Sequence, residues 1–284
     1  MEYIYKQYEI ETKKDIKDKK IVTISDLHFN PNITKYEIDD LILKINDKLP
    51  EYIFILGDIT TFNYLEDNIF KEKILYFFKL LGSISKTYLV LGNHDFLKSP
   101  SEKHHYVNKD KISDFYSNLN VKLLYNYLVQ DDDLNIIGFN KYPINYLYEF
   151  KDISKLRNEI TELLEKIKNL LDNDKYTIFL THSHLDILKL QIEFLKNFDL
   201  ILAGHTHNGL VPSFLENIFP KNMGIYAKGQ LFPNNIRGLI ENDKQTIIVN
   251  GGITKISDSH SSTIKKLTKS LYPGEIDLIN IKKV

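Results

Sequence analysis

Short apolar runs, rich in β-branched residues, alternate along the chain with longer stretches in which apolar residues recur every three to four positions. Six of the short runs have the length of buried strands: residues 20–25, 52–56, 87–91, 134–139, 176–180 and 199–203. Two of the longer stretches carry helical stripes: Ile38, Leu41, Ile42, Ile45 and Leu49, and Ile153, Leu156, Ile160, Leu163, Leu164, Ile167 and Leu171. This alternation predicts an α/β domain.

The C-terminal part differs, because two apolar runs follow each other without a helical stripe between them. These runs are residues 246–253 and 275–281. We expect them to complete a second sheet, so that two sheets pack face to face with helices outside. The chain has no repeat and no low-complexity linker, and 284 residues suffice for a sizeable core. We therefore expect a single domain over residues 1–284.

Charge and composition narrow the classes of partner. The formal net charge is −1, which argues against nucleic acid or an anionic membrane held by bulk electrostatics. Arginine occurs only at Arg157 and Arg237, so a bound phosphate would need positive charge from another source. Cysteine is absent, which excludes disulfide bonds, thiolate metal sites and a cysteine nucleophile.

The sequence predicts neither export nor a membrane span. Residues 1–20 are charged throughout and lack the apolar segment of a secretory signal peptide. No apolar run approaches the roughly 18–20 residues that a membrane-spanning helix needs. We therefore expect a cytoplasmic protein, with peripheral membrane association left open.

Side chains that can bind metals follow five of the predicted strands. They are Asp26 and His28, then Asp58, then Asn93, His94 and Asp95, then His182 and His184, and finally His205 and His207. Because the carboxyl ends of strands in an open α/β sheet converge on one crevice, these residues should meet there. Glycines at 57, 92 and 204 suit the sharp turns that this arrangement requires.

Taken singly, most of these motifs are weak. A Ser-Asp-Leu-His run is commonly a helix cap with a surface histidine, and Gly-Asp is a common turn. The strongest run is the one that ends in His205 and His207, because two histidines one residue apart after an apolar strand suggest a pair of metal ligands. If all five motifs were only turns, helix caps and surface histidines, their position at equivalent strand ends would require five coincidences. The combination therefore predicts a metal site.

In their order and spacing, the motifs resemble the five-block signature of calcineurin-like metallophosphoesterases over essentially the whole chain. The resemblance implies a four-layer α/β/β/α sandwich with a two-metal centre. The positions that it assigns to the metals are Asp26, His28 and His207 for one ion, Asn93, His182 and His205 for the other, and Asp58 as the bridge between both.

The ligand types agree with such a centre. Oxygen and imidazole ligands without thiolate suit Mn²⁺, Fe, Zn²⁺ or Co²⁺, and we expect two divalent ions, with Mn²⁺ preferred. Two metals about 3.5–4 Å apart can clamp the attacking and leaving oxygens of an in-line displacement. Against Asp26, Asp58 and a bridging hydroxide, two dications leave a charge of about +1, which attracts phosphate without arginine.

Two residues are expected to act in catalysis beside the metals. His94 follows the ligand Asn93, and the resemblance places it near the leaving-group oxygen as a general acid or an electrostatic stabiliser. Histidine changes its charge near neutral pH and can serve in either role. Asp95 would orient His94 or the surroundings of Asp26. For His184 a substitute ligand, a residue of the pocket wall and a residue without a direct role all stay open.

We expect four loops to determine the substrate specificity, and none of them contains a recognisable motif. They are residues 60–72, 98–110, 140–152 and 208–235. His104 and His105 lie in the second loop and are interpreted as solvated, with substrate contact as the alternative. Residues 208–233 are unusually apolar and form either a hairpin packed on the sheet or an apolar edge beside the metals. Residues 227–230, 249–253 and 273–281 also resemble the bacterial branch that contains lipid-precursor pyrophosphatases and cell-envelope phosphoesterases.

We therefore expect a phosphoesterase that hydrolyses a phosphate ester or pyrophosphate bond by in-line attack of a metal-bridging hydroxide. Its substrate would be a small phosphorylated molecule, with nucleotide-linked and lipid-linked molecules among the candidates. Two alternatives stay open: a DNA or RNA nuclease of the same fold, and a non-catalytic binding module. The near-zero net charge disfavours the nuclease, and the complete set of ligand positions disfavours the binding module.

Overall fold

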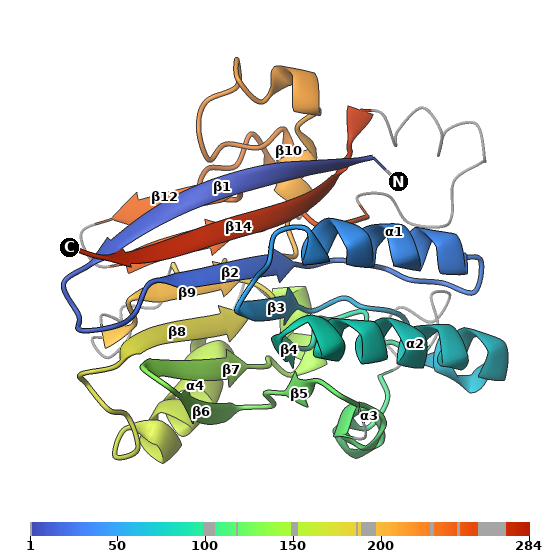
Figure 1. Ribbon diagram of the computed structural model, residues 1–284, viewed down its shortest axis with the longest axis horizontal. Helices are drawn as coiled ribbons and strands as arrows, with labels where there is room; N and C mark the ends of the chain where they lie inside the picture. The colour runs from blue at the N-terminus through green and yellow to red at the C-terminus, as the bar shows by residue number, and fades with distance from the viewer. Residues whose placement is uncertain are drawn as a thin grey trace.

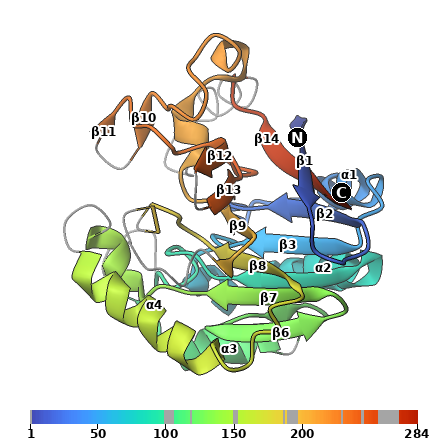
Figure 2. The same cartoon turned by 90° about the vertical axis from the view of Figure 1, so that its left-hand side faces the viewer.

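The computed structural model describes residues 2–98, 106–117, 119–148, 153–185, 187–188, 197–227, 230–242, 245–254 and 271–284. In this part of the chain, two six-stranded sheets lie at the centre, and helices lie on their outer sides (Figures 1 and 2). The order of the strands decides where the five motifs lie.

The first sheet is built around the strands that precede the first three motifs. In spatial order its strands are β1 (Tyr3–Thr12), β14 (Gly274–Lys283), β2 (Lys19–Ile24), β3 (Tyr52–Leu56), β4 (Lys86–Val90) and β5 (Lys122–Leu123). β2 to β5 run parallel, whereas β14 runs antiparallel to β2 and parallel to β1. The carboxyl ends of β2, β3 and β4 therefore lie next to one another.

The second sheet supplies the last two motifs in the same way. In spatial order its strands are β12 (Gly238–Asn242), β13 (Gln245–Val249), β9 (Leu200–Ala203), β8 (Tyr176–Thr181), β7 (Leu134–Phe139) and β6 (Tyr127–Asp131). β13, β9, β8 and β7 run parallel, and β12 and β6 add an antiparallel strand at each edge. The ends of β8 and β9 are therefore neighbours.

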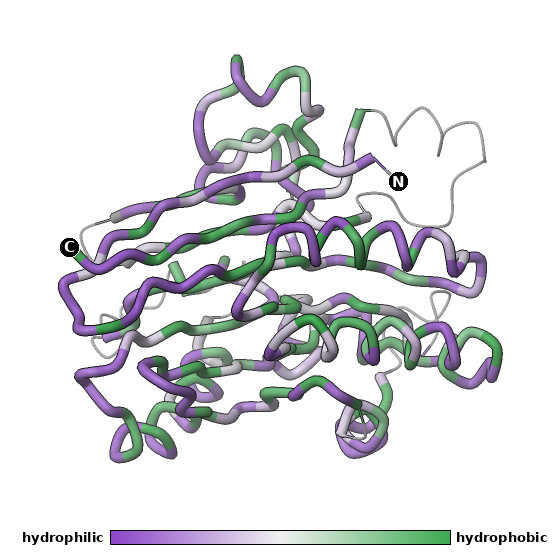
Figure 3. The backbone as a smooth tube through the Cα atoms, in the orientation of Figure 1, coloured by the Kyte–Doolittle hydropathy of each residue, from purple (hydrophilic) through white to green (hydrophobic). Residues whose placement is uncertain are grey.

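Apolar side chains from both sheets fill the space between them. Phe54 and Leu56 of β3 belong to the same buried cluster as Ile178 and Leu180 of β8. Every residue of these two strands is buried, as expected for parallel strands that are covered on both faces. Figure 3 shows the hydrophobic segments that run along the central strands.

Helices bury the outer face of each sheet. α1 (Lys35–Asn46), α2 (Asn68–Ile84) and α3 (Lys109–Ser117) cover the first sheet, and α4 (Ile153–Ile167) covers the second. α1 begins at Thr34, which exchanges hydrogen bonds with Glu37 in a capping box. The predicted four-layer α/β/β/α sandwich is confirmed. No helix in the described ranges is both long and apolar enough to span a membrane.

One prediction about the sheets is wrong. Residues 275–281 do not complete the second sheet, because β14 pairs with β1 over its whole length and with β2 on its other side. Of the two C-terminal runs, only the one that contains β13 joins the second sheet. The partner of β14 is β1, a strand that was not among the strands predicted from the sequence. The single-domain prediction stays a prediction.

A second correction concerns the predicted substrate loop at residues 60–72. The short helix η1 (Phe62–Glu66) and the first turn of α2 occupy it. Asp67 fixes the start of α2, because its side chain accepts the backbone N–H groups of Ile69 and Phe70. Less of this segment is therefore free to contact a substrate than the sequence suggested.

The chain between β9 and β12 forms a projection beside the strand ends. It contains η4 (His207–Leu210), η5 (Ser213–Leu215) and a small hairpin of β10 (Tyr226–Ala227) and β11 (Gln230–Leu231). Figures 1 and 2 show this projection rising above the sheets. The expected loops at residues 98–110 and 140–152 are described only in part, and η2 (Pro143–Tyr148) lies in the second of them.

Candidate metal centre

The loops that follow β2 and β3 are bonded to each other, which fixes the first two motifs. The backbone N–H of Asp26 donates to the carbonyl oxygen of Gly57 at 3.0 Å, and that of His28 donates to the carbonyl oxygen of Asp58 at 3.0 Å. These bonds continue the parallel pairing of the two strands into the loops. The side chains of Asp26, His28 and Asp58 are thereby held beside one another.

The motif loops approach one another so closely that two positions require glycine. Gly57 has a φ of +87°, and a Cβ there would lie 2.5 Å from the backbone nitrogen of Gly92 and 2.8 Å from Nδ1 of His182. At Gly92, a Cβ would lie 2.2 Å from Oδ1 of Asp58. The turn predicted at Gly57 is confirmed, whereas Gly92 is needed for the close approach of Asp58.

Five of the seven predicted ligand residues have a left-handed backbone. Their φ values are 49° for Asp26, 44° for His28, 53° for Asp58, 74° for His205 and 48° for His207. For residues other than glycine, this conformation costs about 1–2 kcal/mol each. Such strain persists only where the surrounding structure imposes it, and it gathers at functional sites.

Asp26, His28 and His207 form one cluster of potential ligand atoms, which all lie within 4.8 Å of one another. Asp26 Oδ1 is 3.8 Å from Nε2 of His28 and 3.6 Å from Nε2 of His207. The other oxygen, Oδ2, accepts the hydroxyl of Ser25 at 2.6 Å and the backbone N–H of His205 at 2.9 Å. These bonds orient the carboxylate so that Oδ1 faces the two imidazoles.

Asp58, His182 and His205 form a second cluster, in which the potential ligand atoms also lie within 4.8 Å of one another. Nδ1 of His182 donates to the carbonyl oxygen of Leu56 at 2.7 Å, so Nε2 is the nitrogen that can bind a metal. This Nε2 is 3.2 Å from Oδ2 of Asp58 and 2.8 Å from Nδ1 of His205. All three side chains are buried.

Asp58 stands between the two clusters. Its Oδ2 lies 3.7 Å from Nε2 of His28 in the first cluster and 3.2 Å from Nε2 of His182 in the second. Its Oδ1 accepts the backbone N–H of His94 at 2.7 Å, which fixes the plane of the carboxylate. One carboxylate oxygen is therefore within reach of both clusters.

The donor set fits divalent metal ions. Among the described atoms, the buried Oδ1 atoms of Asp26 and Asn93 have no hydrogen-bond partner, and buried polar atoms without a partner are costly. Atoms that bind one ion at about 2.0–2.2 Å lie about 3–3.6 Å apart. The separations of 3.2 to 3.8 Å around Asp26 and Asp58 are close to this range. The two clusters are consistent with a dimetal site.

Burial and the charges within the clusters shift the pKa values of three proposed ligands. Although burial alone would raise the pKa of Asp58, the imidazoles of His182 and His94 hold it well below its usual range. Burial lowers the pKa of His28 to about 3, so this imidazole is neutral. Burial also acts to lower the pKa of His182, but the Asp58 carboxylate raises it to about 9, so a metal there would displace a proton.

Asp95 lies beneath the motif loops. Its Oδ1 accepts the backbone N–H groups of Ile59 and Thr60, and its Oδ2 accepts those of Asp58 and Gly92, at 2.8 to 3.1 Å. Burial and the nearby Asp58 raise the pKa of Asp95 to about 7. These four bonds join the loops after β3 and β4, so the contacts make Asp95 a positioning residue. Its catalytic role stays a prediction.

His94 lies at the edge of the centre and is half-buried. Its ring meets the ring of His28 edge to face, with centroids 4.7 Å apart. One of its nitrogens also lies within 4.8 Å of ligand atoms of His28 and Asp58. The side chain can therefore reach a group that is bound at the clusters, and its catalytic role stays a prediction.

His184 occupies a different place from the residues of the clusters. It is fully buried, and its Nε2 donates to the carbonyl oxygen of Asn235 at 2.7 Å. This bond ties the loop after β8 to the projection between β9 and β12. His104 and His105 lie outside the described residues.

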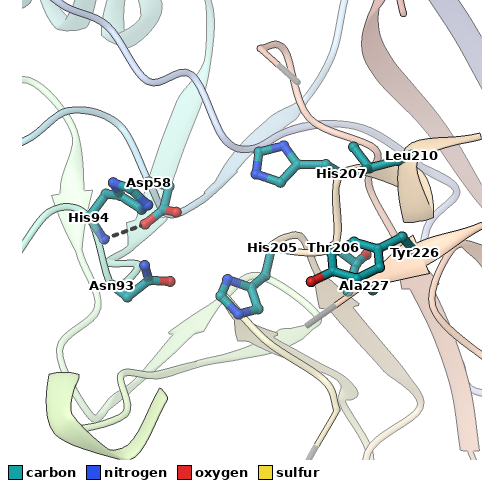
Figure 4. A pocket seen from close by; sticks show the side chains of 9 residues that line it. All are labelled: Asp58, Asn93, His94, His205, Thr206, His207, Leu210, Tyr226 and Ala227. Carbon is teal, nitrogen blue, oxygen red and sulfur yellow. Dashed lines mark hydrogen bonds between the residues drawn. The ribbon is translucent and has the colours of Figure 1, made fainter. Parts of the chain in front are cut away.

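A cavity of about 170 Å³ opens beside the clusters. Its lining residues are Asp58, Asn93, His94, His205, Thr206, His207, Leu210, Tyr226 and Ala227. Figure 4 shows Asp58, Asn93 and His94 on one side of the cavity and Leu210 and Tyr226 on the other.

Two tyrosines beside the centre were not found from the sequence. Tyr226 belongs to a two-residue strand, which is too short to show a periodic pattern. Tyr146 of η2 has its ring centroid 5.8 Å from that of His182 and 5.3 Å from that of His205. No motif surrounds either tyrosine, so only the tertiary structure reveals them.

Comparison with known sequences identifies the family of the chain. The family described as calcineurin-like phosphoesterase matches residues 19–209. An uncharacterized metallophosphoesterase of Campylobacter jejuni is 28% identical over 211 residues, which cover 74% of this chain and 50% of that protein. Another, of Aquifex aeolicus, is 26% identical over 226 residues and covers 77% of each chain. The chain spans about half the length of the Campylobacter jejuni and Helicobacter pylori relatives.

Solved structures with similarity to this chain include two hydrolases of low sequence identity. A phosphopantetheinyl hydrolase from Mycobacterium tuberculosis has a TM-score of 0.45 and 12% identity, with 82% of this chain and 89% of that chain covered. A dimetal phosphatase from Danio rerio has a TM-score of 0.48 and 10% identity, with 84% of this chain and 88% of that chain covered.

The family match includes both clusters and extends over more than half of the chain. The more specific bacterial branch and the cytoplasmic location stay predictions. The chain belongs to the calcineurin-like phosphoesterase family of metal-dependent enzymes.

Proposed function

We propose that the protein uses two divalent metal ions to hydrolyse a phosphate ester or a pyrophosphate bond. The position of Asp58 carries this proposal, because its Oδ2 faces His28 of one cluster at 3.7 Å and His182 of the other at 3.2 Å. The proposed ligands are Asp26, His28 and His207 for one ion, Asn93, His182 and His205 for the other, and Asp58 for both. We expect Mn²⁺ at both positions, with Fe, Zn²⁺ or Co²⁺ as alternatives.

When bound, the two ions supply positive charge for the phosphate and lower the pKa of a water molecule for in-line attack. His94 lines the cavity on the side of Asp58 and Asn93, where its imidazole can donate a proton to the leaving-group oxygen. Asp95 keeps the loop that carries Asp58 in place through its bonds to backbone N–H groups. The residues of the chain thus hold the ions, fix the shared carboxylate and deliver a proton.

The proposed substrate is a small phosphorylated molecule, with nucleotide-linked and lipid-linked molecules among the candidates. The cavity of about 170 Å³ is smaller than the roughly 300–1,000 Å³ of typical small-molecule pockets. It has room for the phosphoryl group and the adjoining part of the ester. The remainder of a larger substrate would extend over the neighbouring surface.

Removal and return of metal test the proposal. Protein treated with EDTA should be inactive toward p-nitrophenyl phosphate and bis(p-nitrophenyl) phosphate, and Mn²⁺ should restore activity. Asp58→Asn should prevent restoration for every substrate while the far-UV circular dichroism stays that of the wild type. Asp132→Asn, which changes an exposed carboxylate in the turn between β6 and β7, is the matched control and should stay active.

Activity that survives EDTA, or an active Asp58→Asn variant, would contradict the proposal. With the metal requirement established, a panel of a cyclic nucleotide, a lipid-linked pyrophosphate and single-stranded DNA separates the substrate classes. Hydrolysis of DNA alone would favour the nuclease alternative.

A further inference from the structure

The projection between β9 and β12 gives the cavity an apolar wall on the side opposite His94. Leu210 follows His207 at the end of η4, and Tyr226 and Ala227 form β10. All three side chains line the cavity beside His207 (Figure 4). A group attached to a phosphate at the clusters would therefore meet the carbon atoms of Leu210 and Ala227 and the ring of Tyr226, whose hydroxyl group points into the cavity.

The apolar surface continues out of the cavity along the hairpin. Tyr226 lies directly opposite Leu231 in the antiparallel pair of β10 and β11, so these two side chains share one face. Tyr226 is 43% exposed and Leu231 is 72% exposed. The next residue, Phe232, is also exposed and stacks on Phe219 with ring centroids 6.4 Å apart. Figure 3 shows hydrophobic stretches on this projection, and adjoining exposed apolar side chains mark an interaction site.

Hydrogen bonds hold this wall in a fixed place relative to the clusters. The hydroxyl of Thr206, between two proposed ligands, donates to the carbonyl oxygen of Ile236 at 2.5 Å. His184 makes the equivalent bond to Asn235 from the loop after β8. Within the projection, Nε of Arg237 donates to a backbone carbonyl oxygen at 2.8 Å. The wall is therefore preorganised to receive a ligand.

The charge of the lining argues for an apolar group. Among the described residues that line the cavity, none is lysine or arginine. A substrate with phosphate groups in addition to the reacting one would need cationic side chains to bind them. The basic side chains of this lining are histidines, and these lie beside the metal clusters. Apolar atoms that leave water at this wall contribute about 25 cal/mol per Å².

We propose that Leu210, Tyr226 and Leu231 bind the alcohol portion of the substrate, and that this portion is an alkyl or aryl group. The inference rests on the proposed phosphoesterase function and specifies the class of ester. The phosphoryl group lies at the clusters, and the carbon chain runs along the wall toward Leu231. Substrate preference should then rise with the apolar area of the alcohol.

Binding of n-alkylphosphonates, from methyl to octyl, to the Mn²⁺-loaded protein tests this inference without any turnover. These compounds keep one phosphonate group and differ only in chain length. Calorimetry should show a dissociation constant that falls about fourfold for each methylene group that is fully buried, and less for partly buried ones. The decrease should level off where the chain passes Leu231.

Variants of the wall separate apolar contact from other effects. Tyr226→Ser and Leu231→Ser should each flatten the dependence on chain length, whereas Tyr226→Phe keeps the ring and should retain it. Leu170→Ser removes another exposed leucine, which is 61% exposed against 72% for Leu231; it precedes β8 and so lies away from the carboxyl ends of the strands, and its replacement should change nothing.

Two results would overturn the apolar subsite: dissociation constants that do not depend on chain length, and failure of every alkylphosphonate to bind. A chain-length dependence that survives in the Tyr226→Ser/Leu231→Ser double variant would overturn it as well. The proposed function fails separately, if the protein binds these compounds but hydrolyses no phosphate ester.

Discussion

Replacement of Gly57 by alanine adds one carbon atom at the point where three motif loops meet. At its φ of +87°, alanine costs about 1–2 kcal/mol relative to glycine. The new Cβ would also lie 2.5 Å from the backbone nitrogen of Gly92 and 2.8 Å from Nδ1 of His182, and such overpacking costs about 1–3 kcal/mol. The free energy of unfolding should therefore fall by about 2–5 kcal/mol.

Gly238→Ala is the matched control for this variant. Gly238 also has a positive φ, of +64°, but the atoms nearest to a Cβ there would be 3.9 Å away. Its free energy of unfolding should fall by only about 1–2 kcal/mol. Urea denaturation of the metal-free proteins measures both values, and titration with Mn²⁺ should show weaker binding only in Gly57→Ala, because the new Cβ displaces His182. Equal losses of stability, or unchanged Mn²⁺ binding in Gly57→Ala, would refute the packing argument.

Three further predictions concern single side chains. His94→Ala should retain both metals and lose about 10²–10⁴-fold in kcat, with a smaller loss for p-nitrophenyl phosphate than for an alkyl phosphate; equal losses would exclude the acid role. His184→Ala should also retain both metals but lose about 1–3 kcal/mol of stability in urea, because the fully buried imidazole leaves a cavity and its hydrogen bond to Asn235 is lost; loss of a metal would contradict this prediction. Burial raises the pKa of Glu159 from 4.5 to about 7, so the folded state holds this proton more tightly than the unfolded chain and stability falls as the pH rises between these values. Glu159→Gln should remove this decrease. The test is the free energy of unfolding in urea at several pH values: a difference between variant and wild type that does not change with pH would contradict the prediction.

The position of the candidate site could be predicted from the sequence because strand ends and chemistry coincide there. Buried parallel strands such as β3 and β8 are short continuous apolar runs, and polar residues that follow them must lie at the carboxyl edge. Asp58 and His182 follow directly from this rule. No knowledge of side-chain contacts was needed to bring these residues together.

Other parts of the structure depend on contacts that a local pattern does not show. β1 carries charged residues and is stabilised by β14, which lies at the opposite end of the chain. α2 buries an apolar stripe that includes Phe70, Ile74 and Phe77, and its first turn lies within residues 60–72, where a substrate loop was expected from the sequence. The role of Asp95 depends on four backbone groups from two loops, which only the folded chain brings within reach.

The cavity wall was the least predictable part of the site. The sequence indicated an apolar segment between β9 and β12, and it left open whether this segment packs on the sheet or borders the metals. In the structure Val211 is buried, whereas Phe214 and Ile218 are exposed and Leu210 borders the cavity. The segment therefore combines buried and exposed apolar residues, and of the residues predicted to border the metals Leu210 lines the cavity, whereas packing of the segment on the sheet stays a prediction.

The central claim is that two metal ions share the carboxylate of Asp58. Anomalous scattering from crystals grown with excess Mn²⁺ measures the number and the positions of these ions directly. The account predicts two peaks per chain about 3.5–4 Å apart, one in each cluster, with Asp58 in contact with both. A single peak at full occupancy, or two peaks of which only one contacts Asp58, would contradict it.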